Sequence, residues 1–229
     1  MSERAISHVV GFDDAPFQRG HRGDVLVVGA VFAGHRLDGV VSTQVRRDGV
    51  NGTARLAECL TGSKSFEQLQ AVLLQGIAFA GFNVVDLSAL HRAIGLPVLT
   101  IARHAPDLAA IRKALLEKVP GGARKWRLIE AAGPMAPMAG VYCQHAGIDA
   151  ANAQKLIASL QIQGLLPEPL RVAHMIAGAV VLLLTLARSS LPQFVNFGPS
   201  YPGMLGLTWN GRDLDRRFLV EMERPVWDS

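Results

Sequence analysis

Three aspartates and one glutamine stand where apolar segments end, and their oxygen atoms could bind a hard divalent cation. Asp13 and Asp14 close the segment SHVVGFDD, Asp48 closes a β-rich run at VRRDG, and Gln75 closes VLLQ directly before a glycine. A turn explains the aspartates equally well, because Asp accepts hydrogen bonds from nearby backbone and Asp-Gly is a strong turn signal. From position alone, a metal site and ordinary turns both stay open.

Other side chains near these ends could contact a phosphate or move a proton. Arg103 ends an apolar run, where a phosphate contact and a solvated strand end are both reasonable. His174 shares a predicted helix with Arg171, after the unusual sequence Pro-Glu-Pro, and Asn83 lies in the loop that follows Gln75. That loop, GIAFAGFN, fails the G-x-G-x-x-G spacing, which argues against a dinucleotide cofactor.

The segments that position these residues follow the order β-β-β-α-β-α-β-α. Hydrophobic periodicity and turn signals predict strands at 7–14, 24–34, 37–49, 71–76 and 96–103, and helices at 84–94 and 107–119. The segment 53–70 is predicted to be helical at first, with an interruption at Gly62 and Ser63. One or two short strands are predicted within 126–144, followed by helices at 149–161 and 167–187. Residues 1–187 are predicted to form one domain, and 188–229 an extension of unknown role.

This order predicts an α/β fold with a mixed sheet, three antiparallel strands followed by α/β crossovers, and helices on both faces. It resembles the ribonuclease H-like fold rather than a doubly wound nucleotide binder, which would alternate strands and helices from the start. In that arrangement the first strand lies beside the fourth. Asp13 and Gln75 are therefore expected to meet at neighbouring strand ends.

Composition narrows the class of protein. The chain has 229 residues, 49% of them hydrophobic, and a net charge of +4, which permits a polyanionic partner without demanding one. Its longest apolar stretch, 175–187, is shorter than the ~20 residues needed to span a bilayer, so a buried helix is favoured over a membrane role. Two cysteines without metal-ligand spacing and the lack of a signal-peptide pattern favour a cytoplasmic protein with reduced thiols.

Five stretches occur in the order found in one known family: VVGFDDAPF, VRRDGVNGTARLAECL, LLQGIAFAGFNVVDL, GLPVLTIARHAPD and LPEPLRVAH. Over residues 8–178 the chain resembles the endonuclease V-like proteins, specifically the branch called DUF99 or endonuclease dU. The resemblance implies a ribonuclease H-like fold and a role in DNA repair. It also implies hydrolysis of a phosphodiester near a deaminated base in DNA or RNA, with Mg²⁺ or Mn²⁺ as the cofactor.

The resemblance also implies roles for single residues. Asp13 matches a metal-binding aspartate, and Asp48 lies near the place of a catalytic glutamate. His174 matches an aspartate or histidine that follows Pro-Glu-Pro, and Arg103 replaces a lysine beside the active site. Gln75 departs from the pattern, because the family has a metal-binding aspartate there. Glutamine keeps one carbonyl ligand but loses a full negative charge.

These observations support three hypotheses about function. In the first, Asp13, Asp48 and Gln75 hold the metal of a nuclease, His174 serves catalysis, and Arg103, Arg171 and Asn83 contact the nucleic acid. In the second, the loss of charge at Gln75 leaves an inactive nucleic-acid-binding or interaction protein on the same fold. The third is an α/β domain without a nucleic-acid role. Asp14 or Asp86 could also replace the lost charge.

Overall fold

The computed structural model describes residues 6–18, 20–188, 196–197, 207–209 and 212–213. The chain divides into two compact units, Met1–Gly178 and Ala179–Ser229. In the second unit, three short strands pair: β10 (Asn196–Phe197), β11 (Leu207–Trp209) and β12 (Arg212–Asp213). Most of the predicted extension at 188–229 lies outside the described residues, so its role stays a prediction.

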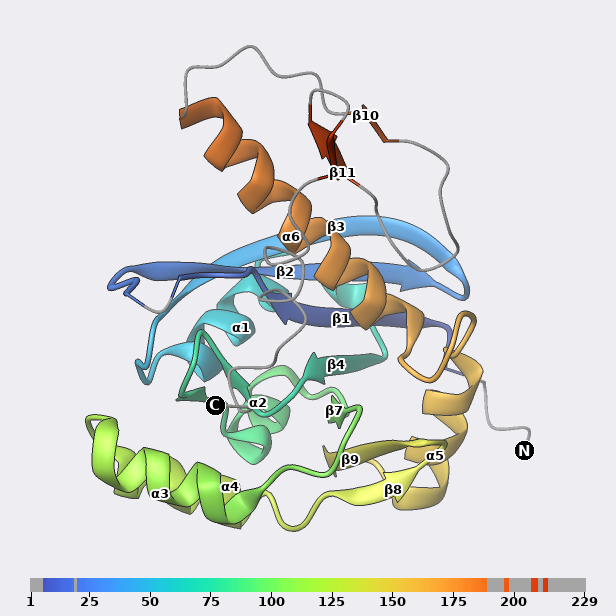
Figure 1. The fold of residues 1–229 in the computed structure, drawn as a ribbon. Coiled ribbons are helices and arrows are strands. Elements are labelled where there is room, and N and C mark those ends of the chain that lie inside the picture. Colours follow the sequence, from blue (N-terminus) through green and yellow to red (C-terminus); the bar gives the residue numbers. More distant parts are fainter. Residues whose placement is uncertain (1–5, 19, 189–195, 198–206, 210–211, 214–229) are drawn as a thin grey trace. The chain divides into compact units, whose positions relative to one another are not determined.

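A seven-stranded mixed sheet forms the centre of the first unit, in the order β3-β2-β1-β4-β7-β9-β8 (Figure 1). The bounds of its strands are β1 His8–Asp14, β2 Asp24–Ala33, β3 Arg36–Arg46, β4 Ala71–Gln75, β7 Val98–Ala102, β8 Ala136–Met138 and β9 Val141–Ala146. The short strands β5 (Ala78–Phe79) and β6 (Asn83–Val84) pair separately as a hairpin. The expected neighbourhood of the first and fourth strands is confirmed, because β1 pairs in parallel with β4.

Strand directions bring several chain segments to one edge of this sheet. β1 pairs antiparallel with β2, and β2 antiparallel with β3, so β1 and β3 run in the same direction. β4 is parallel to β1, and β7 is parallel to β4. The carboxyl ends of β1, β3, β4 and β7 therefore lie at the same edge, which we call the carboxyl edge.

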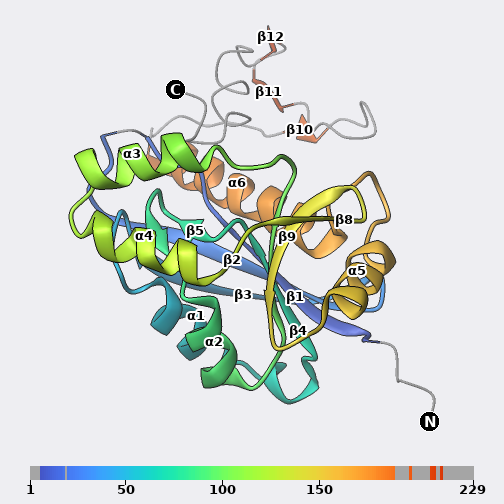
Figure 2. The same ribbon diagram turned by 90° about the horizontal axis from the view of Figure 1, so that it is seen from below.

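Helices cover both faces, as predicted (Figure 2). Their bounds are α1 Gly52–Thr61, α2 Leu87–Ile94, α3 Leu108–Lys118, α4 Gly122–Ala131, α5 Ala150–Ser159 and α6 Glu168–Arg188. On one face, side chains of α1 and α2 pack against Val10, Phe12, Val72 and Leu74. On the other, side chains of α5 and the first turns of α6 pack with Val9. Alternation along β1 thus separates two apolar cores.

The sequence prediction missed one helix. The short strands predicted within 126–144 are present as β8 and β9, but residues 126–131 belong to helix α4, which begins at Gly122 and was not predicted. The Pro-Gly-Gly sequence at 120–122 does end the preceding helix, but Gly121, with φ 70°, then starts a new one. Helix α1 ends at Thr61, directly before the predicted interruption at Gly62 and Ser63, and a short 3-10 turn, η1 (Phe66–Gln68), follows.

The apolar stretch 175–187 is part of α6. Among the described residues, no helix combines the length and the apolar character that crossing a membrane would require.

Candidate active site

Most of the residues singled out in the sequence gather at the carboxyl edge. Asp13 and Asp14 end β1, Asp48 follows β3, Gln75 ends β4 and Arg103 follows β7. Side chains that follow the carboxyl ends of parallel strands commonly form the sites of α/β proteins. Their gathering depends on strand order, because β1 pairs with β4 although residues 15–70 separate the two strands in the chain.

Asp13 and His174 form the central contact of the site. The Asp13 carboxylate is 4% exposed, and its Oδ2 lies 2.7 Å from Nδ1 of His174, while Oδ1 accepts a hydrogen bond from the backbone N–H of Asp14. Since a carboxylate accepts the bond, Nδ1 of His174 carries the proton, which leaves Nε2 for other partners. The imidazole comes from α6, and its side chain is 44% exposed.

Burial and charge alter the protonation of this pair. Burial raises the pKa of Asp13, and the hydrogen bond and charge of His174 oppose that rise. The hydrogen bond to Asp13 raises the pKa of His174. Burial, and then the charge of Asp13, raise the pKa of Asp14 to about 7. Burial therefore disfavours the charged form of both carboxyl groups, a setting that favours acceptance of a proton or a cation.

Gln75 is the neighbour of Asp13 across the sheet. Phe12 pairs with Leu74, so the next residues on the two parallel strands are Asp13 and Gln75, on the face that carries α6. The Gln75 side-chain oxygen, Oε1, is buried and accepts no hydrogen bond within the described part of the chain. A buried acceptor without a partner costs about 1–3 kcal/mol, and a cation bound beside Asp13 would satisfy it.

Gly11 lets α6 approach β1 closely enough for His174 to reach Asp13. A Cβ at Gly11 would lie 2.6 Å from the carbonyl carbon of Pro169 and 2.7 Å from the backbone nitrogen of Leu170. Both contacts are with backbone, which cannot move aside as a flexible side chain would. The absence of a side chain at Gly11 therefore fixes the depth at which the first turn of α6 sits on the sheet.

Gly11→Ala is expected to lower the free energy of unfolding by about 1–3 kcal/mol, because α6 must shift to relieve the overlap. Urea unfolding monitored by circular dichroism measures this change. The matched control is Gly39→Ala on β3, where an added Cβ meets nothing closer than Val31 at 4.0 Å. Equal stability of the two variants would contradict the close packing of α6 on β1.

Asp14 and Asp48 hold the β5–β6 hairpin rather than pointing at Asp13. Asp14 faces away from Asp13, and its Oδ2 accepts a 2.6 Å hydrogen bond from the N–H of Ala80. Oδ1 of Asp48 accepts a 2.9 Å bond from the N–H of Phe82, and the Asp48 backbone N–H donates to the carbonyl of Ala80. The buried Lys125 amine also donates to the Asp48 carbonyl. The possible metal-binding role of Asp48 remains a prediction.

Asn83 is fully buried, and its amide is used within the protein. Its Oδ1 accepts from the N–H of Gly52 at 2.9 Å, while Nδ2 donates to the carbonyl of Arg46 at 2.9 Å and to Oδ1 of Asn51 at 2.8 Å. These bonds join β6 to the end of β3 and the start of α1. A role of Asn83 in substrate binding stays a prediction, and its contacts describe a structural one.

Asn83→Ala is expected to lower the free energy of unfolding by about 1–3 kcal/mol for each buried group that it leaves without a partner. Chemical unfolding measures the loss. Asn152→Ala is the control, because Asn152 makes exposed hydrogen bonds to Asp149 at the start of α5. Unchanged stability of Asn83→Ala together with weaker nucleic-acid binding would instead support the substrate-binding role.

The remaining predicted residues differ in how they relate to Asp13. The positive charge of Arg103 acts on both Asp13 and His174 and lowers the pKa of each, against the larger effects given above. Arg171 forms two hydrogen bonds with Glu168 on the same helix. Asp86 caps α2, since its Oδ1 accepts from the N–H of Ala89 at 2.9 Å. Sequence reasoning did not single out Lys125, which lies in helix α4, a helix that was not predicted.

The donor set of Asp13 and Gln75 carries a single negative charge, which is the smallest charge that a protein site for a divalent cation commonly has. Within the described residues, no three His, Cys, Asp or Glu side chains gather in a way that could hold a metal ion. Asp13 and Gln75 nevertheless offer one carboxylate and one orphaned carbonyl oxygen from the ends of neighbouring strands. Mg²⁺ is commonly held by one or two carboxylates together with water and substrate phosphates. The residues therefore fit a cation that shares its ligands with a bound substrate.

Comparisons with known proteins identify the family of the chain. Residues 5–181 match the family model described as Endonuclease dU. A UPF0215 protein of Deinococcus radiodurans is 59% identical over 175 residues, covering 76% of this chain and 89% of that protein. A UPF0215 protein of Methanothermobacter thermautotrophicus is 41% identical over 178 residues, covering 76% and 87%.

Solved structures show the same fold. A protein of unknown function from Archaeoglobus fulgidus has a TM-score of 0.71 and 30% identity, covering 76% of this chain and 98% of that one. Endonuclease V of Ciona intestinalis, in complex with a DNA that contains an inosine followed by a ribo-adenosine, has a TM-score of 0.51 and 13% identity, covering 78% and 87%. The fold is thus that of the ribonuclease H-like endonuclease V proteins, and the chain belongs to the endonuclease dU family.

Proposed function

We propose that this protein is a metal-dependent endonuclease that hydrolyses a phosphodiester near a deaminated or damaged base. The observation that carries the proposal is the buried Asp13 carboxylate, hydrogen-bonded to His174 and adjacent to the orphaned Oε1 of Gln75. Family membership and the nuclease-like fold support it.

In this proposal Asp13 and the carbonyl oxygen of Gln75 would hold Mg²⁺ or Mn²⁺. When bound, the cation would supply Lewis-acid chemistry for the phosphodiester and would lower the pKa of a water molecule. Asp13 also orients the imidazole of His174 through Nδ1. The free Nε2 of His174 then accepts or donates a proton near the scissile phosphate, and the positive charge of Arg103 stabilises the added negative charge there.

Strand cleavage tests this proposal. Labelled DNA and RNA oligonucleotides that contain one inosine or one uracil are incubated with Mg²⁺, with Mn²⁺ or with a chelator, and undamaged strands of the same sequence serve as controls. We expect cleavage near the altered base that depends on the cation. Cleavage that persists in chelator, or that is equal on undamaged strands, would contradict the proposal.

A second candidate is a catalytically inactive nucleic-acid-binding protein, and one observation favours it. Gln75 leaves Asp13 as the one carboxylate on this face among the described strand ends β1 and β4, since Asp14 faces away and binds Ala80. This candidate predicts salt-dependent binding of DNA or RNA without turnover. Binding of the oligonucleotides above without cleavage by either cation would support it over the nuclease.

A further inference from the structure

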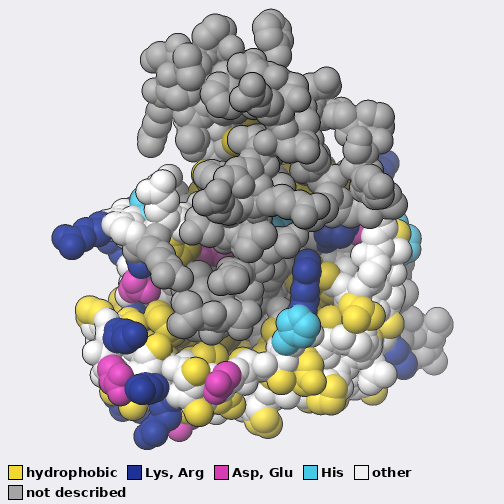
Figure 3. Space-filling model, viewed as in Figure 1, with side chains coloured by type: hydrophobic (Ala, Val, Ile, Leu, Met, Phe, Trp, Pro, Cys, Tyr) yellow, Lys and Arg dark blue, Asp and Glu magenta, His cyan; other side chains and the backbone are white. Residues whose placement is uncertain are grey.

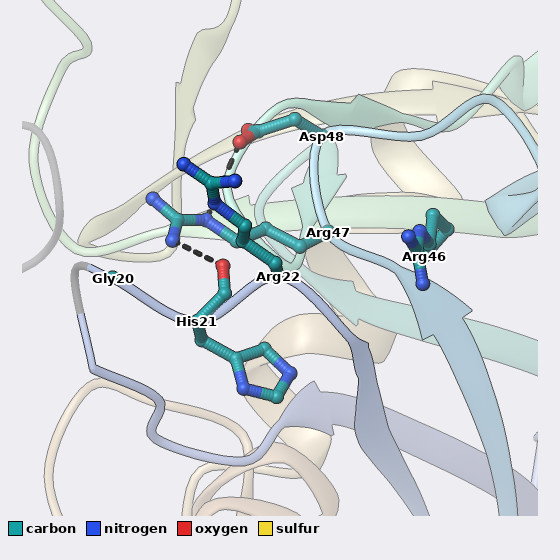
Figure 4. Close-up of a pocket in the computed structure, with 6 residues that line it drawn as sticks. All are labelled: Gly20, His21, Arg22, Arg46, Arg47 and Asp48. Carbon is teal, nitrogen blue, oxygen red and sulfur yellow. Dashed lines mark hydrogen bonds and ion pairs between the residues drawn. The ribbon is translucent and has the colours of Figure 1, made fainter.

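An arginine-lined pocket opens at the start of β2 and the end of β3. It has a volume of about 500 Å³ and is lined by Gly20, His21, Arg22, Arg46, Arg47 and Asp48. In the view of Figure 4, Arg22 and Arg47 extend in the same direction, and Arg46 lies apart from them. This volume falls within the usual range of ligand pockets, about 300–1,000 Å³.

Arg47 lines one side of the pocket and is held in place by several contacts. Its Nη1 donates to the carbonyl of His21, its Nε lies 3.3 Å from Oδ2 of Asp48, and its guanidinium lies 5.5 Å from the ring centre of Phe17. A guanidinium held on several sides keeps its position, so less entropy is lost when an anion binds beside it. The side chain of Arg47 is 24% exposed.

The other two arginines give the pocket its net positive charge. The Asp48 carboxylate is already engaged by Arg47 and by the N–H of Phe82. Arg22 is exposed, and Arg46, with 58% of its side chain exposed, has a long 3.7 Å ion pair with Asp24. Exposed ion pairs of this kind contribute about 0–1 kcal/mol to stability. Arg46 can therefore leave Asp24 and bind a phosphate at little cost in free energy.

The pocket lies at the carboxyl edge, as the candidate active site does. On β2, Val28 pairs with Asp13, and Asp24, four residues nearer the pocket, pairs with Arg46. Four residues of a strand span roughly 13 Å. That distance corresponds to a few nucleotides, since one strand of a duplex rises ~3.4 Å per phosphate.

The β5–β6 hairpin connects the two places. Asp48, in the wall of the pocket, binds Phe82 and Ala80, and Ala80 binds Asp14 next to Asp13. A chain of short hydrogen bonds therefore fixes the pocket relative to the Asp13–His174 pair. A nucleic-acid strand bound in the pocket would therefore lie at a fixed offset from Asp13 and His174.

We propose that this pocket binds a backbone phosphate of the nucleic-acid strand, a few nucleotides from the bond presented to Asp13. The inference rests on the proposed function, which supplies the nucleic acid. Arginine is suited to this ligand, because its planar guanidinium donates two parallel hydrogen bonds to phosphate oxygens.

A surface with mixed charge makes the α3–α4 hairpin a weaker candidate for this contact. At the lower left of Figure 3, over these helices, Lys and Arg side chains alternate with Asp and Glu among apolar side chains. Exposed Leu108 and Leu116 belong to α3. The pocket instead concentrates three arginines around one engaged carboxylate.

The test measures binding separately from cleavage. Fluorescence anisotropy in chelator gives the affinity of wild type and of Arg22→Gln/Arg46→Gln for a labelled oligonucleotide between about 50 and 200 mM salt. The matched control is Arg36→Gln/Arg92→Gln, which removes the same charge. Arg36 is the first residue of β3, at the edge of the sheet opposite the carboxyl edge. Arg92 lies in the last turn of α2, before β7 begins at that same opposite edge.

We expect the pocket variant to bind about tenfold or more weakly and its salt slope to fall by about one, because one phosphate contact is lost. The control should keep most of the affinity and the slope. Unchanged melting temperatures show that both variants fold. Equal weakening of the two variants, or no binding by wild type at low salt, would overturn the inference.

Competition separates a strand phosphate from a free one. Inorganic phosphate or a mononucleotide at matched phosphate concentration should displace the labelled strand poorly, and equal displacement would overturn binding of a strand. Failure of the inference is distinct from failure of the proposed function. If the wild type binds through the pocket but never cleaves, the pocket inference holds and the proposed nuclease function is refuted. If the wild type cleaves and the pocket variant binds as well as the wild type, the nuclease function holds and the pocket inference is refuted.

Discussion

Asp13→Asn is expected to lower the rate of cation-dependent strand cleavage by about 10³-fold, the cost of removing one main electrostatic contribution from an active site. The substitution keeps the size of the side chain but removes the carboxylate that would bind the cation. It also removes the anion that orients His174 and raises the pKa of its imidazole. Single-turnover cleavage of an inosine-containing oligonucleotide measures the rate.

Stability distinguishes this effect from misfolding. The Asp13 carboxylate is 4% exposed, and burial is the largest influence on its pKa, so a neutral amide relieves a desolvation cost. Asp13→Asn should therefore melt at or above the wild-type temperature. Active-site residues commonly lower the stability of the folded state, and their replacement then raises it. Binding of the oligonucleotide in chelator should persist.

Asp14→Asn is the matched control, because it removes the adjacent charge on the opposite face. The amide oxygen of Asn can still accept the hydrogen bond from Ala80, so the β5–β6 hairpin stays in place. Its effect on cleavage should be much smaller than that of Asp13→Asn. Similar losses in the two variants would show that the site depends on total charge rather than on Asp13, and full activity of Asp13→Asn would place the chemistry elsewhere.

The contact between Asp13 and His174 shows what the sequence can and cannot predict. The strand order, read from apolar runs and turn signals, placed β1 beside β4, so the nearness of Asp13 and Gln75 was predictable. The reach of His174 from a helix 161 residues away depends on the packing of α6 at Gly11, which no local pattern reveals. The sequence singled out His174 by its place on a predicted helix after Pro-Glu-Pro, and the family resemblance implied its role, but neither gave its contact with Asp13.

Turn chemistry explains why the roles of Asp48 and Asn83 were harder to predict. Asp48 has φ 50°, a left-handed conformation that Asp tolerates better than most residues, and this agrees with the Asp-Gly turn signal. Its hydrogen bond to Phe82 joins segments 34 residues apart, as does that of Asn83 to Gly52 over 31. Polar residues that support a loop and polar residues that bind a ligand look alike until those partners are known.

The arginine pocket was missed for a related reason. Arg46 and Arg47 are visible in the sequence as a basic pair before a turn, but Arg22 joins them only because β2 and β3 pair with Asp24 opposite Arg46. A net charge of +4 spread over the chain gives no hint of such a concentration. Antiparallel register, rather than composition, brings the three arginines together.

Gln75→Asp is expected to bind Mg²⁺ at least about tenfold more tightly than the wild type, because a second carboxylate beside Asp13 adds a full charge next to the cation. The concentration of Mg²⁺ that gives half-maximal cleavage measures this change. Gln75→Asn is the matched control, with the same shorter side chain and no charge. It should bind the cation no better than the wild type.

Thermal unfolding gives an independent readout that does not require activity. Without a cation, two neighbouring carboxylates repel each other, so Gln75→Asp should melt below Gln75→Asn. Added Mg²⁺ should reverse that order, because a ligand that binds only the folded state stabilises it in proportion to its affinity. Identical responses of the two variants to Mg²⁺ would contradict a cation site between Asp13 and Gln75.

The same pair of variants decides between the two candidate functions. If the wild type already cleaves, Gln75→Asp should do so at lower Mg²⁺ concentration, and the orphaned Oε1 of Gln75 is then a weak but sufficient ligand. If the wild type only binds, cleavage that appears in Gln75→Asp and not in Gln75→Asn would show that Asp13, His174 and the substrate contacts are still arranged for catalysis. The missing charge at Gln75 would then be the one change that separates a binding protein from a nuclease.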